Sequence, residues 1–573
     1  MNKTRVQVCI GILLLFFGFA IYKLIDIQLV SPESYGPEQV NLLEESVNQR
    51  TSQITLSSGR GIFVDRDNQP LNTSLKKDII IFPFVQSIEL TPTIEDTLNS
   101  FDENWENKLG KKDEAVYLSD LVDQEITDSI YNIINKASIP GIVAVERNVP
   151  GELLIASHLL GVIRSNEEEY RVRYEENTTS NHAQPIGISG LEKTFDPFLI
   201  SENDQKLMYH VDAKGDPLLG LDIRFQGKND PFYPIQVQTT IDTGIQSLTE
   251  EILDKHGLIK GGVVLLDVDT QEVLAMASRP SIDQSDPFNN NSINNQMLTA
   301  HYPGSVFKTV VAAAAMESNI NLLDENYNCS LDLYGEGTAE RDLGVLNFSQ
   351  SFAQSCNYTF GLLANQLMTE NRSILESYAD KLGLLTSVGW EGDLYHFDNF
   401  KQLPEEEEGN VWGNEEDRYV ERAIAQTAIG QKEVKVTPLA IANMMATIAN
   451  NGVKGEVKVV DQLLYNNGTT MTKFAPHANI DNSIKGETAK QLQQLLAAVV
   501  QNGTGQRLSG LQIAGKSGTA QTGREDQYHH WFAGFFPVEN PEYAMVVVDL
   551  DQSTEKAKTY QVYKEITTSL LES

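Results

Sequence analysis

An apolar run near the N-terminus is long enough to form a membrane-spanning helix. The residues from Val6 to Tyr22 are almost all apolar, Lys23 interrupts the run, and the apolar pattern resumes as LIDIQLV. A helix crosses a bilayer with about 20 apolar residues. The poor A-x-A motif at Gly18-Phe19-Ala20 argues against cleavage. The pattern therefore predicts an uncleaved signal anchor at residues 6–27, with a cleaved signal peptide as the alternative.

Positive charge before this run predicts its orientation. Lys3 and Arg5 lie among the first five residues, and positive residues are retained on the cytoplasmic side of a membrane. We therefore expect a single-pass protein of the cell membrane. Residues 1–5 form its cytoplasmic tail, and the rest of the chain after the anchor is extracytoplasmic.

Residues 28–233 mix short strand-like and helical stretches and contain no apparent internal repeat. The stretch RGIFVDRDNQPL at 60–71 combines a strand-like Ile-Phe-Val with a turn at Asp67-Asn68. The pattern of apolar and polar positions along the sequence changes near Pro234. We therefore predict a mixed domain at 28–233 and a second domain at 234–573.

The second domain has a more regular pattern of apolar positions. GIQSLTEEILDKH has helical spacing, and two apolar runs, GGVVLLDV and EVLAMAS, follow as a hairpin. A helix is expected to begin at about Ser305. Near the C-terminus three strand-like runs (LQIAGKSGTAQ, HWFAGFFP and YAMVVVDL) precede an amphipathic helix. This order predicts an α+β fold in which an antiparallel sheet is flanked by helices and carries a large helical insert.

Length, charge and composition narrow the possible classes of protein. The 573 residues suggest two or three domains, and 41% hydrophobic residues suffice for packed cores. A net charge of -35 argues against nucleic-acid binding, which needs a basic surface. The acidic runs at 405–408 and 415–417 are interpreted as solvated loops.

The cysteines and histidines do not indicate a metal site. Cys9 lies in the apolar run, which leaves Cys329 and Cys356 either as one disulfide or as two free thiols. The chain has no H-E-x-x-H motif and no paired Cys/His spacing. We therefore expect neither a metal nor a cofactor.

The stretch HYPGSVFKTVVAAAAM, residues 301–316, contains a candidate nucleophile. Ser305 follows a Pro-Gly turn in the expected first turn of a helix, where free N–H groups and the positive end of the helix dipole meet. Lys308, three residues later, shares its face of the helix. Apolar neighbours should bury Lys308 and lower its pKa, so that it could act as a base.

Two further motifs raise the significance of this pair. S-x-x-K also occurs at Ser74 and Ser553, so it is a weak signal alone. Ser355-Cys356-Asn357 forms an S-x-N motif, and Lys516-Ser517-Gly518-Thr519 is the single K-[ST]-G in the chain. Gly518, on a predicted strand, would let a substrate backbone approach closely. The three motifs in this order are the signature of penicillin-binding proteins and serine β-lactamases.

Because it contains these three motifs in this order, the chain resembles a class B penicillin-binding protein, a monofunctional peptidoglycan D,D-transpeptidase. YPGSVFK, GGVVLLDVDTQEVLAMASRP and the segment 428–452 are similar to corresponding segments of that family. Arg60-Gly61 and Gly190-Leu191-Glu192 resemble its non-catalytic pedestal, or dimerisation-like, domain. The resemblance implies a pedestal at 28–233 and a transpeptidase domain at 234–573.

The resemblance also implies roles for the motif residues. Ser305 would attack the penultimate D-alanine of a stem peptide, and Lys308 would take its proton. Ser355 would relay a proton, and Asn357 would hold the substrate amide. The remaining motif, Lys516, Ser517, Gly518 and Thr519, would bind the terminal carboxylate and the peptide edge. β-Lactams would acylate the same serine.

Several other functions are alternatives to this one. A β-lactamase or a D,D-carboxypeptidase could use the same Ser-Lys site, and a non-catalytic wall-synthesis scaffold belongs to a different class of function. A Ser-His-Asp hydrolase is disfavoured because the chain has no G-x-S-x-G motif. Expected partners are peptidoglycan stem peptides, the membrane, a membrane glycosyltransferase and other wall-synthesis proteins.

Overall fold

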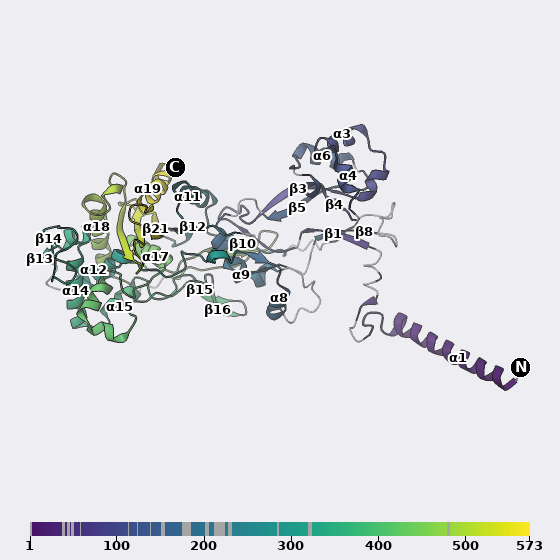
Figure 1. The fold of residues 1–573 in the computed structure, drawn as a ribbon, viewed down its shortest axis with the longest axis horizontal. Coiled ribbons are helices and arrows are strands. Elements are labelled where there is room, and N and C mark those ends of the chain that lie inside the picture. Colours follow the sequence, from purple (N-terminus) through teal and green to yellow (C-terminus); the bar gives the residue numbers. More distant parts are fainter. Residues whose placement is uncertain are drawn as a thin grey trace. The chain divides into compact units, whose positions relative to one another are not determined.

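The structure of the protein is a computed structural model, shown as a ribbon in Figure 1. It describes residues 3–36, 40–42, 46, 51–57, 59–112, 114–122, 124–137, 139–150, 155–174, 185–200, 205–210, 224–226, 232–283, 286–318, 324–477 and 482–572.

The chain divides into two compact units. Unit 1 contains residues 1–59, 74–150 and 201–229, and unit 2 contains residues 60–73, 151–200 and 230–573. Segments 60–73 and 151–200 thus pack within unit 2, although both fall within the predicted pedestal at 28–233. The expected boundary at residue 234 stays a prediction.

Unit 1 begins with helix α1 (Lys3–Ile25), which continues as a short π-helix (Asp26–Val30). Among the described residues, Gln7–Val30 is the one helical stretch long and apolar enough to cross a membrane. Its large apolar side chains are exposed, from Val8 to Val30. The helix is therefore compatible with the predicted anchor.

The rest of unit 1 contains two small sheets and several helices. One sheet has the order β1-β8-β9 and the other β4-β3-β5. Trp105 and Ile80 are buried in a core of their own, and the buried Asp78 accepts a hydrogen bond from Arg147 Nε at 2.8 Å. The elements are β1 (Thr51–Ser57), β3 (Thr73–Ile81), β4 (Val116–Tyr117), β5 (Ile142–Pro150), β8 (Gln205–His210), β9 (Arg224–Gln226), α3 (Pro92–Asn99), α4 (Trp105–Leu109), α5 (Leu118–Leu121) and α6 (Asp128–Ala137).

Unit 2 is built on a five-stranded antiparallel sheet of order β12-β11-β21-β20-β19. The strands are β11 (Gly261–Asp267), β12 (Val273–Arg279), β19 (Ala514–Gln521), β20 (Tyr528–Phe536) and β21 (Tyr543–Gln552). The predicted hairpin and the three predicted C-terminal strands are therefore confirmed, as is the α+β class.

Both faces of this sheet are covered by helices. Because side chains alternate along a strand, Val263 and Leu265 pack with α11 (Thr243–His256) and α19 (Thr559–Glu572). Val264 and Leu266 belong to the opposite core, which includes α12 (Lys308–Glu317), α17 (Pro438–Ala449) and α18 (Gly486–Asn502). Burial on both faces explains why these strands are continuous apolar runs in the sequence.

The predicted helical insert lies between β12 and β19. It contains α12, α13 (Phe348–Ala353), α14 (Asn357–Glu370), α15 (Ile374–Lys381), α16 (Glu421–Ala428), α17 and α18, with two-stranded sheets β13 (Asn326–Asn328) with β14 (Val345–Asn347) and β15 (Glu391–Leu394) with β16 (Phe397–Lys401). Segments 60–73 and 151–200 add β2 (Ile62–Val64), β6 (Ile163–Arg164), β7 (Ile186–Gly187), α7 (Ser157–Leu160), α8 (Glu167–Arg173), α9 (Gly190–Thr194) and α10 (Asp196–Leu199).

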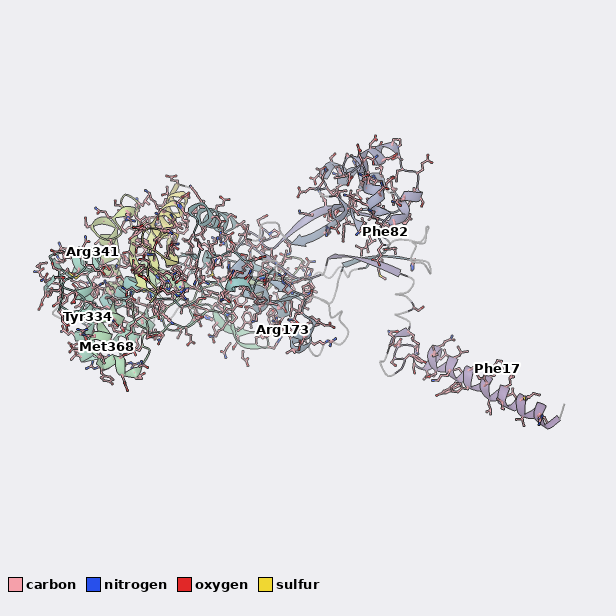
Figure 2. All side chains as sticks on the ribbon, viewed as in Figure 1. Phe17, Phe82, Arg173, Tyr334, Arg341 and Met368 are labelled. Carbon is pink, nitrogen blue, oxygen red and sulfur yellow. A yellow bond between two sulfur atoms is a disulfide. The ribbon has the colours of Figure 1, made fainter. Side chains whose placement is uncertain are left out.

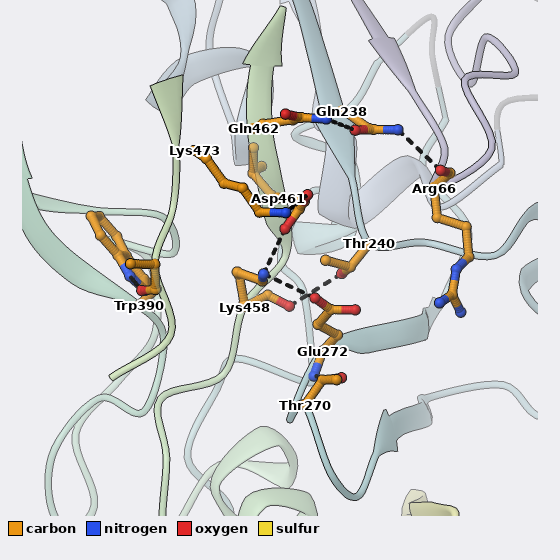
Figure 3. Close-up of polar contacts among 12 residues, drawn as sticks. Arg66, Gln238, Thr240, Thr270, Glu272, Trp390, Lys458, Asp461, Gln462 and Lys473 are labelled. Carbon is orange, nitrogen blue, oxygen red and sulfur yellow. Dashed lines mark hydrogen bonds and ion pairs between the residues drawn. The ribbon is translucent and has the colours of Figure 1, made fainter. Parts of the chain in front are cut away.

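A second sheet of unit 2 has the order β18-β17-β10-β2. Its remaining strands are β10 (Gln236–Thr239), β17 (Val460–Leu464) and β18 (Thr470–Lys473). Beside it, the buried Lys458 ammonium lies 2.9 Å from Glu272 and 2.6 Å from Asp461, as Figure 3 shows. Thr240 donates a hydrogen bond to the backbone oxygen of Lys458 at 3.1 Å. These contacts connect the second sheet to the start of β12.

The acidic run at 405–408 is not simply a solvated loop. Glu406 is buried, and one of its carboxylate oxygens accepts hydrogen bonds from the N–H groups of Val388 and Gly389, each at 2.9 Å. Glu407 accepts a hydrogen bond from the N–H of Ala300 at 2.7 Å. The interpretation as a solvated loop is therefore wrong for Glu406, because backbone donors from a separate segment, at Val388 and Gly389, satisfy its carboxylate.

Candidate active site

The segment that carries Ser305 starts with a tight turn. Gly304 has a φ of 55°, in the left-handed region that favours glycine. Residues Gly304–Phe307 then form a 3-10 turn, and the α-helix begins at Lys308. The sequence predicted an α-helix from about Ser305, so the first turn is tighter than expected. Ser305 is half-buried, whereas Lys308 is fully buried.

Close backbone contacts fix this turn against its neighbours. Gly304 N–H donates to Gly430 O at 3.0 Å, and a Cβ on Gly304 would lie 2.6 Å from Thr519 O. A Cβ on Gly518 would lie 2.5 Å from Pro303 O. Both glycines therefore let the Ser305 turn lie directly against strand β19. The expectation that Gly518 also admits a substrate backbone stays a prediction.

The Lys308 ammonium is held by the S-x-N segment. Lys308 Nζ donates to Ser355 O at 2.8 Å, to Asn357 Oδ1 at 2.6 Å and to Ser355 Oγ at 3.1 Å. Ser355 has a φ of 59°, a conformation that non-glycine residues rarely adopt. This conformation turns the chain just before α14 begins at Asn357.

A second lysine reaches the same serine. Lys516 Nζ donates to Ser355 Oγ at 3.1 Å and to Ser517 O at 3.1 Å, and its side chain is fully buried. The Ser355 hydroxyl oxygen is thus within hydrogen-bond distance of both ammonium groups. The structure therefore brings together Lys308, Ser355, Asn357 and Lys516, four of the residues predicted from the three motifs.

The two lysines have lowered pKa values. Burial lowers the pKa of Lys308 well below its usual value, and the positive charges of Lys516 and Arg341 lower it further. Burial, with a contribution from the charge of Arg341, lowers the pKa of Lys516 to about 7. A lysine with such a pKa can be neutral near neutral pH and can then accept a proton.

Strand β19 borders this cluster at the edge of the sheet. Ser517 Oγ lies 2.6 Å from Thr504 Oγ1, and Thr504 O accepts a hydrogen bond from Tyr560 at 2.9 Å. Ser517 is half-buried and Thr519 is exposed. An edge strand offers unpaired backbone groups to which an extended peptide can add.

A disulfide joins Cys329 to Cys356, with an S–S distance of 2.17 Å. The sequence left a bridge and two free thiols open, and the structure decides for the bridge. Both cysteines are buried, and Cys356 is the middle residue of the S-x-N motif. The position of Cys356 in that motif was the signal that could have pointed to a role near the site.

The other S-x-x-K serines lie in different settings. Ser74 is in strand β3 of unit 1, and its side chain lies outside the described residues. Ser553 is in the loop that follows β21. Neither lies where Ser305 does, directly before a helix: Ser74 is inside the strand, and α19 begins at Thr559, six residues after Ser553. Among the described residues, no group of three or more His, Cys, Asp or Glu side chains could hold a metal ion.

Comparison with known proteins identifies the family. Residues 261–572 match the family model of the penicillin binding protein transpeptidase domain, and residues 55–229 match that of the penicillin-binding protein dimerisation domain. The chain belongs to the class B penicillin-binding proteins. The recognition made from the motifs is therefore confirmed.

This penicillin-binding protein has relatives in several bacteria. It is 28% identical to the penicillin-binding protein PbpB of Mycolicibacterium smegmatis, over 64% of this chain and 58% of that protein. It is 23% identical to the peptidoglycan D,D-transpeptidase FtsI of Escherichia coli, over 96% of this chain and 88% of that protein. The match thus spans little more than half of the mycobacterial relative.

Solved structures agree on the fold of this penicillin-binding protein. A chain of a peptidoglycan synthase complex, solved in a study of how polymerization and crosslinking are coordinated, superposes with a TM-score of 0.67. The two chains are 21% identical, and the match covers 98% of each. A likeness at this identity supports the fold class.

Proposed function

We propose that this class B penicillin-binding protein is a peptidoglycan D,D-transpeptidase that works through a serine acyl-enzyme. The observation that carries the proposal is the buried Lys308, one turn after Ser305 and hydrogen-bonded to Ser355 and Asn357. A neutral lysine in this position can take the proton of the nucleophile. The names of relatives such as FtsI support the same reaction.

The proposed reaction has two halves. Ser305 Oγ attacks the carbonyl carbon of the penultimate D-alanine while Lys308 accepts the hydroxyl proton. The C–N bond then breaks, and the terminal D-alanine leaves with a proton delivered through Ser355. In the second half, an amine of a neighbouring stem peptide attacks the acyl-enzyme and gives up a proton. The new amide is the cross-link, and Ser305 regains its hydrogen.

Binding groups for this reaction come from the Ser305 turn, from the S-x-N segment and from strand β19. The backbone N–H groups of Ser305 and Thr519 would stabilise the oxyanion, a contribution of about 3–4 kcal/mol for one donor in other enzymes. Asn357 would hold the substrate amide. Lys516, Ser517, Gly518 and Thr519 would bind the terminal carboxylate and the peptide edge. No metal or cofactor takes part in any of these steps.

The apolar helix α1 and the disulfide support a proposal for the location of the protein. We propose that α1 crosses the cell membrane once, with residues 1–5 in the cytoplasm. The Cys329–Cys356 bridge supports an extracytoplasmic catalytic unit, because disulfides persist in oxidising compartments. Residues 28–233 would form the pedestal and residues 234–573 the transpeptidase domain. A membrane glycosyltransferase is the proposed partner, as the peptidoglycan synthase complex among the fold neighbours suggests.

The nucleophile can be tested with a fluorescent penicillin. Ser305→Ala should abolish covalent labelling of the full-length protein in detergent, whereas Ser74→Ala and Ser553→Ala should leave it intact. Mass spectrometry of the labelled protein should place the adduct on the peptide that contains Ser305. Normal labelling of the Ser305→Ala protein would refute the proposed mechanism.

The lifetime of the adduct separates the transpeptidase from its rivals. Retention of the label for many minutes is expected of a transpeptidase, and rapid turnover of a chromogenic cephalosporin would indicate a β-lactamase. With a D-Ala-D-Ala peptide and an added amine, transfer to the amine is expected. Release of free acid alone would indicate a carboxypeptidase. No reaction with either the β-lactams or the D-Ala-D-Ala peptide would indicate a scaffold.

A further inference from the structure

Arg341 lies beside the S-x-N turn on the hairpin formed by residues 326–347. Its guanidinium Nη2 donates a hydrogen bond to Gln354 O at 2.9 Å, and Gln354 immediately precedes Ser355. The disulfide ties the same hairpin, through Cys329, to Cys356 on the other side of Ser355. Figure 2 labels Arg341 on this part of unit 2. Two independent links therefore fix the arginine next to the site.

The charge of Arg341 is exposed and is not neutralised by a carboxylate. Within the described part of the chain, Arg341 has a backbone partner but no acidic side chain at ion-pair distance. Arg422 differs, because it bonds to the same hairpin through an ion pair with Glu336. In a chain of net charge -35, an exposed cation without a carboxylate partner beside the candidate active site favours an anionic ligand.

The lysines of the site are poorly placed to meet that ligand directly. Lys308 and Lys516 are each 0% exposed, and their ammonium groups bond to Ser355, Asn357 and the backbone. A carboxylate that lies against Ser517 and Thr519 therefore finds no exposed ammonium group there, and Lys516 acts on it from the buried side of strand β19. It still needs an accessible charged donor, and a guanidinium keeps its charge at every relevant pH.

We propose that Arg341 binds the free carboxylate that D-Ala-D-Ala peptides and β-lactams both carry. This inference rests on the proposed transpeptidase function and adds a residue outside the three motifs to substrate recognition. The fork of N–H donors on arginine matches a carboxylate, and such charge-assisted hydrogen bonds are the strong ones. The influence of Arg341 on the pKa values of both Lys308 and Lys516 agrees with a position close to their meeting point at Ser355.

The test compares two thioester substrates that differ in charge. One is N-benzoyl-D-alanyl-thioglycolate, which ends in a free carboxylate, and the other is its carboxamide analogue. Steady-state kcat/KM is measured with the full-length protein in detergent. Arg341→Gln should lower kcat/KM for the carboxylate substrate by about 10-fold or more, the usual size for loss of a charged hydrogen bond. The carboxamide should change less than about 2-fold, because it offers no charge to lose.

Two further variants separate binding from structure. Arg341→Lys keeps the charge and should recover part of the loss. Arg422→Gln removes an exposed arginine from contact with the same hairpin and should alter neither substrate more than about 2-fold, since Glu336 already neutralises that charge. Melting temperatures of all variants check that they are folded.

Three outcomes would overturn the inference. Equal losses on both substrates, without recovery in Arg341→Lys, would assign Arg341 a structural role in the hairpin. Unchanged Arg341→Gln kinetics on both substrates, beside normal turnover by the wild-type protein, would refute the inference alone. Wild-type protein that turns over neither thioester and is not labelled by penicillin would refute the proposed function itself, and the inference with it.

Discussion

Removal of the disulfide should destabilise the catalytic unit by an amount that follows from its place in the chain. Cys329 and Cys356 are 27 residues apart. In the chain-entropy treatment, a loop of that length corresponds to about 3.5 kcal/mol of free energy of unfolding. An unfolding entropy of about 2.1 cal/mol/K per residue over residues 234–573 converts this to a fall in melting temperature of about 5 °C. The double variant Cys329→Ala/Cys356→Ala should show that fall.

The assay is differential scanning calorimetry of the full-length protein in detergent, with the catalytic transition identified by its shift on penicillin binding. The reducing agent TCEP should lower the melting temperature of wild-type protein to that of the double variant. Cys9→Ala is the matched control, because Cys9 is a free, exposed cysteine in α1. A double variant that melts within about 1 °C of wild type would refute the reasoning, since the bridge would then not restrict the unfolded chain.

Three other variants test the packing and electrostatics of unit 2, two of them at the site. Gly518→Ala should slow penicillin acylation strongly, because its Cβ would lie 2.5 Å from a backbone carbonyl oxygen next to the Ser305 turn. The control Gly486→Ala, at the start of α18, should leave the acylation rate unchanged. Equal acylation rates for the two variants would contradict this expectation. Lys516→Ala removes a positive charge that lowers the pKa of Lys308, so the acid limb of the acylation pH profile should move to higher pH, and an unmoved limb would speak against Lys308 as the base. Glu406→Gln should flatten the pH dependence of melting temperature: burial raises the pKa of Glu406 from 4.5 to about 7, so the native state binds more protons and wild-type stability falls as pH rises through that window. A wild-type melting temperature that rises over the same window would contradict the last expectation.

Local patterns predicted much of unit 2. The hairpin of β11 and β12 and the three C-terminal strands were visible as apolar runs, because helices cover both faces of the sheet. The burial of Lys308 was predicted from its apolar neighbours and is confirmed. Helix α1 was also predictable, because a run of about 20 apolar residues is a clear signal by itself.

Features that depend on distant contacts were not predictable in this way. The left-handed φ of Ser355 is set by the turn that brings its oxygens to Lys308, and no residue preference indicates it. Glu406 was misjudged because its partners, Val388 and Gly389, lie outside its own acidic run. Arg341 belongs to none of the three motifs, and only the folded hairpin brings it beside Ser355.

The shared hydroxyl of Ser355 couples the two lysines of the proposed mechanism. Two ammonium groups that both lie 3.1 Å from one oxygen repel each other when both are charged. One proton can therefore be held at the pair near neutral pH more easily than two. A substrate carboxylate near Ser517 and Thr519 would favour the charge on Lys516, which lies on that side. The charge on Lys516 would in turn keep Lys308 neutral. Substrate binding would thus prepare the base that acts on Ser305, which links recognition of the carboxylate to the start of the reaction.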